Sequence, residues 1–144
     1  MNDNKSNIIT LESLNSTTSP DFTGFQIAAA YLEKFGAASA LTVDNARMLP
    51  GFDFDDYPYH NLPLGQFPVH LDCKVWAKAR ALRCFLRFQD GRGMCLSVWH
   101  GDYYCPAESE VALNKTPVGT WLMVETAKRK TNDNIFWKSA AIIE

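Results

Sequence analysis

Two short stretches of the chain, at 74–78 and 83–87, place a large aromatic residue between two cationic residues at alternating positions. Successive side chains of a β-strand point to opposite faces, so on two strands each triplet shares one face. Nucleobases stack on exposed aromatic rings, and Lys and Arg neutralise phosphates. The pattern therefore predicts a platform for single-stranded DNA or RNA, provided that the shared face is open to solvent. The predicted platform consists of Lys74, Trp76, Lys78, Arg83, Phe85 and Arg87.

Two further features extend the predicted platform. Trp99 ends a third predicted strand and adds another ring if it points outward. The loop at 128–134 opens with three successive cations that can clamp a phosphate backbone. The alternative is that the rings pack beneath an N-terminal helix and that the loop is only solvated. The three cations are Lys128, Arg129 and Lys130.

An acidic and aromatic segment at 52–57 lies within a proline-rich connector at 50–68. Its mixture of rings and carboxylates predicts a contact with a protein partner. Two alternatives stay open: the segment folds back on the basic face as a mimic of phosphate, or it merely covers the sheet. The predicted partner-binding residues are Phe52, Asp53, Phe54, Asp55, Asp56 and Tyr57.

Metal binding and catalysis have little support in the sequence. The four cysteines, at 73, 84, 95 and 105, contain no Cys-x-x-Cys pair, so reduced and mostly buried thiols are expected and no metal is predicted. The chain carries no Gly-x-Ser-x-Gly, phosphate-binding loop or dinucleotide fingerprint. The sequence therefore predicts a non-enzymatic binding protein without a cofactor.

Composition and charge limit the class of protein. The 144 residues are 47% apolar and 21% charged, which suits one domain with a buried core. No apolar run reaches the ~18–20 residues of a membrane span, and the start lacks a secretory signal, so we expect a cytoplasmic protein without membrane contact. Residues 1–66 hold three basic and eight acidic side chains, and residues 67–144 hold eleven and eight. The basic C-terminal part predicts a polyanionic partner, or contact between the two parts.

Local signals in the first half predict a tail and a helix. Residues 1–19 are polar without a period and are expected to be mobile. Ser19 as N-cap, Pro20 at the first helical position and Gly36 as a stop predict a helix over 20–35. Its expected apolar positions are Phe22, Phe25, Ala29, Leu32 and Phe35.

From residue 69 onward, apolar and polar residues alternate with a period of two, which is typical of strands. The phase slips between Ala79 and Leu82, where a turn or bulge is expected. One helix over 69–89 is the alternative, because apolar residues also form a helical stripe there. The pattern predicts strands over 69–79, 82–89, 94–99, 120–127 and 135–143, a turn at 90–93 and a short helix over 106–114.

Three strands, a short helix and two strands over residues 67–144 resemble the OB-fold, a small five-stranded β-barrel. The resemblance implies a mainly β protein, in which a tail (1–19) and a helical extension with its connector (20–66) precede the barrel. Many OB-folds bind single-stranded nucleic acid through strands two and three and the loops between strands 1–2 and 4–5. Others bind proteins, so a protein-interaction or assembly module, including a homo-oligomer, is the alternative function.

Overall fold

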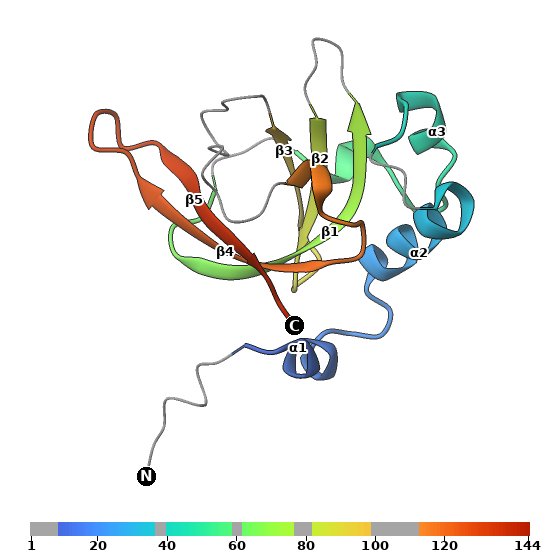
Figure 1. The fold of residues 1–144 in the computed structure, drawn as a ribbon, viewed down its shortest axis with the longest axis horizontal. Helices are drawn as coiled ribbons and strands as arrows, with labels where there is room; N and C mark the ends of the chain where they lie inside the picture. Colours follow the sequence, from blue (N-terminus) through green and yellow to red (C-terminus); the bar gives the residue numbers. More distant parts are fainter. Residues whose placement is uncertain (1–8, 37–39, 59–61, 77–81, 99–112) are drawn as a thin grey trace.

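The computed structural model describes residues 9–36, 40–58, 62–76, 82–98 and 113–144. Five antiparallel strands in these ranges form one curved sheet in the order β3-β2-β1-β4-β5 (Figure 1). The prediction of a mainly β protein is confirmed, and the alternative of one helix over 69–89 is wrong. The strands are β1 (Gln66–Trp76), β2 (Leu82–Phe88), β3 (Gly93–Val98), β4 (Trp121–Lys128) and β5 (Ile135–Ile142).

The long central strand β1 holds the sheet together. Its residues 69–76 pair with β2, and its residues 66–70 pair with β4. The two edges of the sheet are β3 and β5, which do not pair with each other within the described residues. The described strands therefore form one sheet that is not closed into a barrel, and the predicted OB-like barrel is not confirmed. The alternation of apolar and polar residues predicts the individual strands, whereas closure of a barrel depends on contact between the two edge strands.

Three α-helices and two 3₁₀ helices accompany the described strands. Helix α1 lies inside the segment predicted as a mobile tail, which corrects that prediction for residues 9–19. Thr10 and Ser13 cap each other reciprocally at its start, and Leu14 is its buried side chain. A helix with a single buried side chain shows no apolar periodicity in its sequence. The helices are α1 (Leu11–Thr17), α2 (Thr23–Phe35), α3 (Val43–Arg47), η2 (Phe54–Asp56) and η4 (Leu113–Lys115).

Helix α2 confirms the predicted helix, but it begins later, and its fully buried residues differ from the expected ones. Ser19 accepts a hydrogen bond from the Asp21 amide in a preceding turn, and the N-cap of the helix is Phe22. Leu32, expected on the buried stripe, is 43% exposed. Ala29 is also exposed, whereas Phe22 is buried and Phe25 and Phe35 are partly buried, so the expected stripe is confirmed in part. Its buried residues are Gly24, Ile27, Ala28 and Tyr31.

One face of the sheet, called here the inner face, gathers apolar side chains from all five strands. This cluster contains the cross-strand pairs Val69–Phe88 and Leu71–Leu86, and it is the largest of the three apolar clusters among the described residues. Most of the predicted helix at 106–114 lies outside the described residues, and η4 contributes Leu113 to this core. Representative members are Leu71, Leu86, Met94, Leu122 and Trp137.

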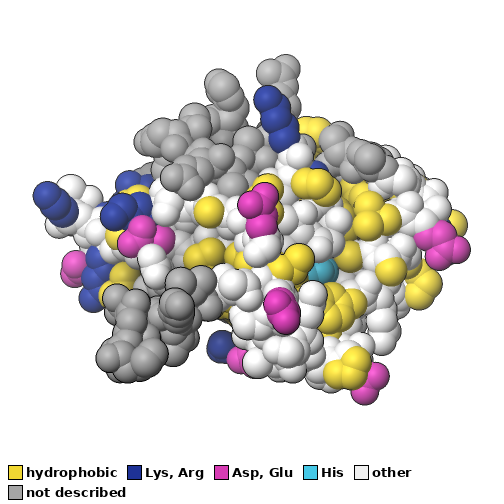
Figure 2. Space-filling view, turned by 60° about the horizontal axis from the view of Figure 1, so that its bottom comes forward, with side chains coloured by type: hydrophobic (Ala, Val, Ile, Leu, Met, Phe, Trp, Pro, Cys, Tyr) yellow, Lys and Arg dark blue, Asp and Glu magenta, His cyan; other side chains and the backbone are white. Residues whose placement is uncertain are grey.

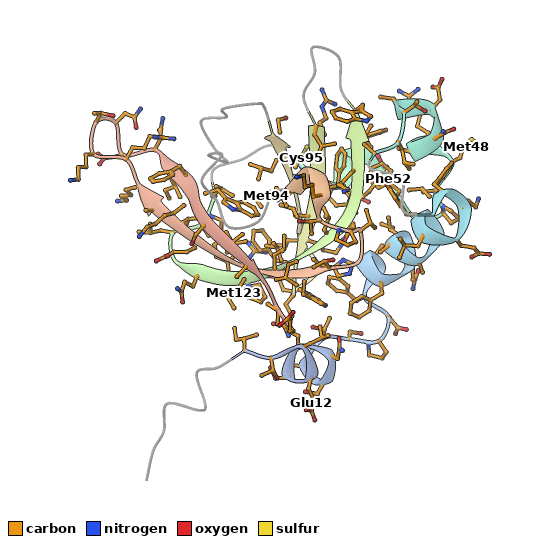
Figure 3. The ribbon with its side chains drawn as sticks, viewed as in Figure 1. Glu12, Met48, Phe52, Met94, Cys95 and Met123 are labelled. Atoms are coloured by element: carbon orange, nitrogen blue, oxygen red, sulfur yellow. The ribbon has the colours of Figure 1, made fainter. Side chains whose placement is uncertain are left out.

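The other face, called the outer face, is covered by α2, α3 and the acidic aromatic segment 52–57, which together form the outer layer. Figure 1 shows both helices on one side of the sheet, beside β1. Figure 3 labels Phe52 and Cys95 in this second core and Met94, which belongs to the inner one. Because both faces of β1 and β2 are covered, few positions on these strands reach solvent.

A β-bulge in β1 changes which residues share a face. Leu71 pairs with Leu86, but Cys73 pairs with Phe85, so Asp72 is an extra residue between two ladder pairs. Directly paired residues of an antiparallel ladder lie on the same face. Odd-numbered residues of β1 therefore belong to the inner core before the bulge and to the outer core after it. The predicted slip at 79–82 falls outside the described residues.

The close approach of α2 to the sheet gives a stability prediction. A methyl group at Gly24 would overlap the Asp72 carboxylate and lie 3.0 Å from His70 Nδ1. Helix propensity favours alanine by about 1 kcal/mol, but overpacking costs about 1–3 kcal/mol. We expect Gly24→Ala to lower the free energy of unfolding in urea, whereas Gln26→Ala, at an exposed position of the same helix, changes it by less than about 0.5 kcal/mol. Equal stability of the two variants would contradict this contact.

Candidate functional site

A carboxylate without solvent exposure, that of Asp72, lies between the sheet and the outer layer. Its Oδ2 accepts hydrogen bonds from Tyr57 Oη at 2.6 Å and Arg87 Nε at 2.8 Å. Its Oδ1 lies 2.6 Å from His70 Nδ1. Arg87 also donates to Tyr57 Oη at 2.9 Å and to the Gly91 carbonyl at 2.7 Å. Asp72, His70, Arg87 and Tyr57 are called here the buried tetrad.

Burial and charge contacts within the tetrad shift the pKa values of Tyr57 and Arg87. Burial, followed by the charge of Asp72, raises the pKa of Tyr57, so the phenol stays protonated and donates. Burial alone lowers the pKa of Arg87, but its hydrogen bonds and charge interactions with Asp72 and Tyr57 outweigh this and raise it. Asp72 and Arg87 therefore form a buried ion pair. Removing one member of such a pair costs about 3–5 kcal/mol, because the other charge stays buried.

The tetrad joins elements that are distant in the sequence. His70 and Asp72 come from β1, Arg87 from β2 and Tyr57 from the acidic aromatic segment. The bulge turns Asp72 toward the same side as His70 and Arg87, which are themselves a cross-strand pair. Gly93 allows the segment to approach β3, because a Cβ there would overlap the Asp56 carbonyl oxygen.

The imidazole of the tetrad is sealed by aromatic rings. The ring centroids of Phe22, Phe25 and Trp121 lie 5.6, 5.3 and 5.1 Å from that of His70. A carboxylate beside an imidazole can orient a general base, but His70 is only 1% exposed. The geometry gives the tetrad a structural role, because its hydrogen bonds hold the outer layer against the sheet.

The second predicted triplet does not form an exposed face. Phe85 is 2% exposed, and the rings of Phe52, Phe54 and Tyr57 lie 5.2–5.5 Å from its centroid. Arg87 is 7% exposed and bound within the tetrad. The prediction that Phe85 and Arg87 face solvent is therefore wrong. The acidic aromatic segment lies where the bound bases were expected.

The first triplet is separated from the second by the bulge. Lys74 pairs with Cys84 and Trp76 with Leu82, so both lie on the inner face, opposite Phe85. Lys74 is 3% exposed, donates to the Thr116 carbonyl at 2.6 Å, and has a pKa lowered by burial. The expected exposure of Lys74 is also wrong. Trp76, at the end of β1, is 47% exposed, and Lys78 and Trp99 lie outside the described residues.

The basic loop, defined as Lys128, Arg129 and Lys130, lies at the surface. Lys128 and Lys130 are exposed, and Arg129 is half-buried, with its guanidinium 4.5 Å from the Phe136 ring centroid. The loop ends a two-stranded arm that projects from the sheet at the side opposite α3 (Figure 1). Figure 2 shows Lys and Arg side chains gathered over this end of the molecule.

The exposed tryptophan and the basic loop do not form one surface. The start of β1 pairs with the end of β4, which leads into the loop, whereas Trp76 ends β1 ten residues later. Ten residues of strand span about 30 Å along the chain. The structure therefore does not bring the predicted rings and the predicted loop together.

The acidic aromatic segment divides into an inward and an outward half. Phe52 and Tyr57 are buried at 8% and 2% exposure, so the prediction that these rings contact a partner is wrong. Phe54 is half-buried, and the three aspartates are exposed. Asp53 accepts a hydrogen bond from the Asp55 amide, which fixes the turn of η2. The outward half is Asp53, Phe54, Asp55 and Asp56.

A cleft of about 320 Å³ opens between this segment and the outer face of β2 and β3. Aromatic rings line it, together with one cationic and one acidic side chain. It contains two residues of the predicted nucleic-acid platform beside two of the outward half of the acidic segment. The lining residues are Phe54, Asp55, Tyr57, Pro58, Arg83, Phe85 and Cys95.

Sequence reasoning missed the tetrad. The alternating pattern identifies His70 and Asp72 only as polar residues of a strand, and it predicts that Arg87 contacts phosphate. A His-x-Asp pair in a strand whose neighbours are apolar is the one available signal, since a buried carboxylate requires partners. Tyr57 carries no local signal, because its partners lie 15 and 30 residues away.

Within the described residues, no group of three or more His, Cys, Asp or Glu side chains is arranged to hold a metal ion. The same part of the chain contains no helix that is long and apolar enough to cross a membrane. Cys73, Cys84 and Cys95 are buried thiols, as predicted, and burial raises the pKa of Cys73; Cys105 lies outside the described residues.

Comparison of the chain with known protein families, with curated protein sequences and with solved structures finds no match.

The raised pKa of Tyr57 gives a pH-dependent stability prediction. At pH 7, Tyr57→Phe removes one hydrogen bond from each of the buried groups Asp72 and Arg87, and we expect a loss of about 1–3 kcal/mol of unfolding free energy. Above the ordinary tyrosine pKa of about 10, only the unfolded phenol ionises, so the stability of the natural protein falls as pH rises. The difference between the two proteins should therefore shrink from pH 9 to pH 11 in urea titrations. A difference that is constant over this interval would contradict the assignment.

Proposed function

We propose that the protein binds single-stranded nucleic acid, without catalysing a reaction, through the basic loop of the β4–β5 hairpin. The observation that carries the proposal is the position of Lys128, Arg129 and Lys130 at the end of a projecting arm. Affinity for a nucleic-acid backbone comes mainly from cations that replace its condensed counterions, and such contacts need no base-specific pocket.

The hairpin holds its cations in a defined place. Pairing continues to Lys128 and Ile135, and the Arg129 amide donates to the Asn134 carbonyl at 2.8 Å. Asp133 adopts a φ of 59°, which closes the turn. The guanidinium over Phe136 restricts Arg129 further. A loop ordered in this way loses less conformational freedom on binding than a flexible chain does.

Local charge supports the choice of partner. Residues 125–138 carry four basic side chains and two acidic ones, whereas the whole chain has a net charge of −2. The arm is therefore a positive region on a weakly negative protein, and it attracts polyanions at low salt. Aromatic stacking on the β1–β2 face has no part in this proposal, because Phe85 is covered.

An OB-like description of the sheet is part of the same proposal. The strand order β3-β2-β1-β4-β5 and the place of η4 between β3 and β4 support it. In OB-folds, the loop between strands four and five is one of the two that contact oligonucleotides. The cytoplasmic location expected from the sequence stays a prediction.

Replacement of the basic loop tests the proposal. We expect the natural chain to bind a fluorescein-labelled mixed-sequence 20-mer of single-stranded DNA with an affinity that falls as salt rises. Single strands contribute a slope of about 0.7 per phosphate contact, so Lys128→Gln/Arg129→Gln/Lys130→Gln should reduce the slope by about 2 and weaken binding at least tenfold at low salt. Fluorescence anisotropy at several NaCl concentrations measures both quantities.

A triple variant with the same charge change is the control. Lys34, Arg47 and Lys115 are exposed and lie outside the arm, so their replacement by Gln should leave the salt slope within about 0.5 of the natural value. Equal losses in both triple variants would show that only net charge matters. Absence of salt-dependent binding by the natural chain would remove the proposed function altogether.

A further inference from the structure

We propose that the cleft between the acidic aromatic segment and β2–β3 binds an arginine side chain from a peptide segment of a protein partner. The cleft is formed by two parts of the chain that meet only in the folded state, η2 with its flanking residues and the paired strands. At about 320 Å³ it lies at the lower end of the range of ligand pockets, about 300–1,000 Å³. It therefore suits one long side chain better than a large ligand.

The walls of the cleft provide aromatic faces. The centroids of Phe54 and Tyr57 lie 5.5 and 5.2 Å from that of Phe85, with interplanar angles of 68° and 78°. Phe54 is the least buried of these three rings. A planar guanidinium stacks on such a ring and is attracted by its π-face. The hydrocarbon part of an arginine side chain can then cover the rest of the apolar wall.

The charge around the cleft selects a cationic ligand. Asp55 lines the cleft, and the exposed carboxylates of Asp53 and Asp56 flank it in the same turn. One carboxylate can accept two parallel hydrogen bonds from a guanidinium, which a lysine ammonium cannot offer in this geometry. Three carboxylates against one cationic lining residue, Arg83, disfavour a phosphate polyanion. The basic loop and the cleft therefore take partners of opposite charge.

The position of Arg83 is the reason for proposing a peptide, and not a simple amine, as the ligand. It is half-buried, lines the β2 side of the cleft, and belongs to the strand that carries Phe85. A guanidinium has five N–H donors in a fixed plane, so it can hold a backbone carbonyl oxygen of the ligand in addition to its contacts within the protein. A peptide residue with a cationic end and a backbone acceptor matches both Asp55 and Arg83, whereas a simple amine matches only Asp55.

The experiment is an NMR titration of the ¹⁵N-labelled full chain with acetyl-Gly-Arg-Gly-amide. We expect saturable shifts of the amides of Phe54, Asp55, Phe85 and Cys95, and no saturable shifts with acetyl-Gly-Gln-Gly-amide. Adenosine monophosphate is the third probe, because it carries a ring and a phosphate. Stronger binding of the nucleotide than of the arginine peptide at these residues would overturn the proposal and assign the cleft to nucleic acid.

Matched variants separate the cleft from general acidity. Asp55→Asn should weaken the arginine peptide at least threefold, and Phe54→Leu should weaken it at least twofold. Asp44→Asn changes an aspartate that is 93% exposed in α3, and it should leave the affinity within 1.5-fold. Equal effects of Asp55→Asn and Asp44→Asn, or equal binding of the arginine and glutamine peptides, would overturn the proposal. These results do not depend on whether the basic loop binds DNA, so the two proposals fail separately.

Discussion

The requirement that a buried carboxylate be neutralised organises this protein. Asp72 is not exposed to solvent, and charges are removed from water at a cost of several kcal/mol unless partners surround them. Its donors come from β2 and the acidic aromatic segment, and the imidazole of His70 lies on its other side. The first turn of α2 packs directly on the same group through Gly24. The outer layer is therefore held to the sheet by one polar centre as well as by its apolar core.

The bulge that carries Asp72 also decides which surfaces remain for binding. Because the faces of β1 exchange at this residue, Lys74 enters the interior while Phe85 and Arg87 come to lie under the acidic aromatic segment. Of the cations predicted to bind phosphate, Lys128 and Lys130 are exposed among the described residues, and they lie on the β4–β5 arm, away from the outer layer. The protein thus separates a basic arm from an acidic, aromatic-lined cleft, and each has the chemistry for a different partner. The aspartates of the cleft come from the acidic N-terminal part of the sequence and the basic arm from its basic C-terminal part, which agrees with the charge asymmetry along the chain.

The strands could be predicted from the sequence because alternation, the Asp-Gly turn and the proline-rich connector are local signals. The face of the sheet on which each residue of β1 lies could not be predicted in this way. Val69, Leu71, Cys73 and Val75 continue one apolar phase through the bulge, since the inner face is buried before it and the outer face after it. Helix α2 also has apolar residues outside the expected stripe, so its period alone does not show that Ile27, Ala28 and Tyr31 are the fully buried side chains. The exposure of the basic loop was predictable, because a run of cations between two strands is rarely buried. The tetrad was not predictable, because its contacts join residues that lie 15 and 30 positions apart in the sequence.

The coupling between Asp72 and Arg87 tests the central claim most directly. Urea unfolding of Asp72→Asn, of Arg87→Gln and of the double variant gives a double-mutant cycle with the natural protein. Each single change leaves a buried group without its charged partner, while the double change removes both charges. The structure predicts a coupling energy of at least about 1.5 kcal/mol, with the double variant no less stable than the weaker single variant. Losses that add within about 0.5 kcal/mol would contradict the claim that this ion pair fastens the outer layer to the sheet.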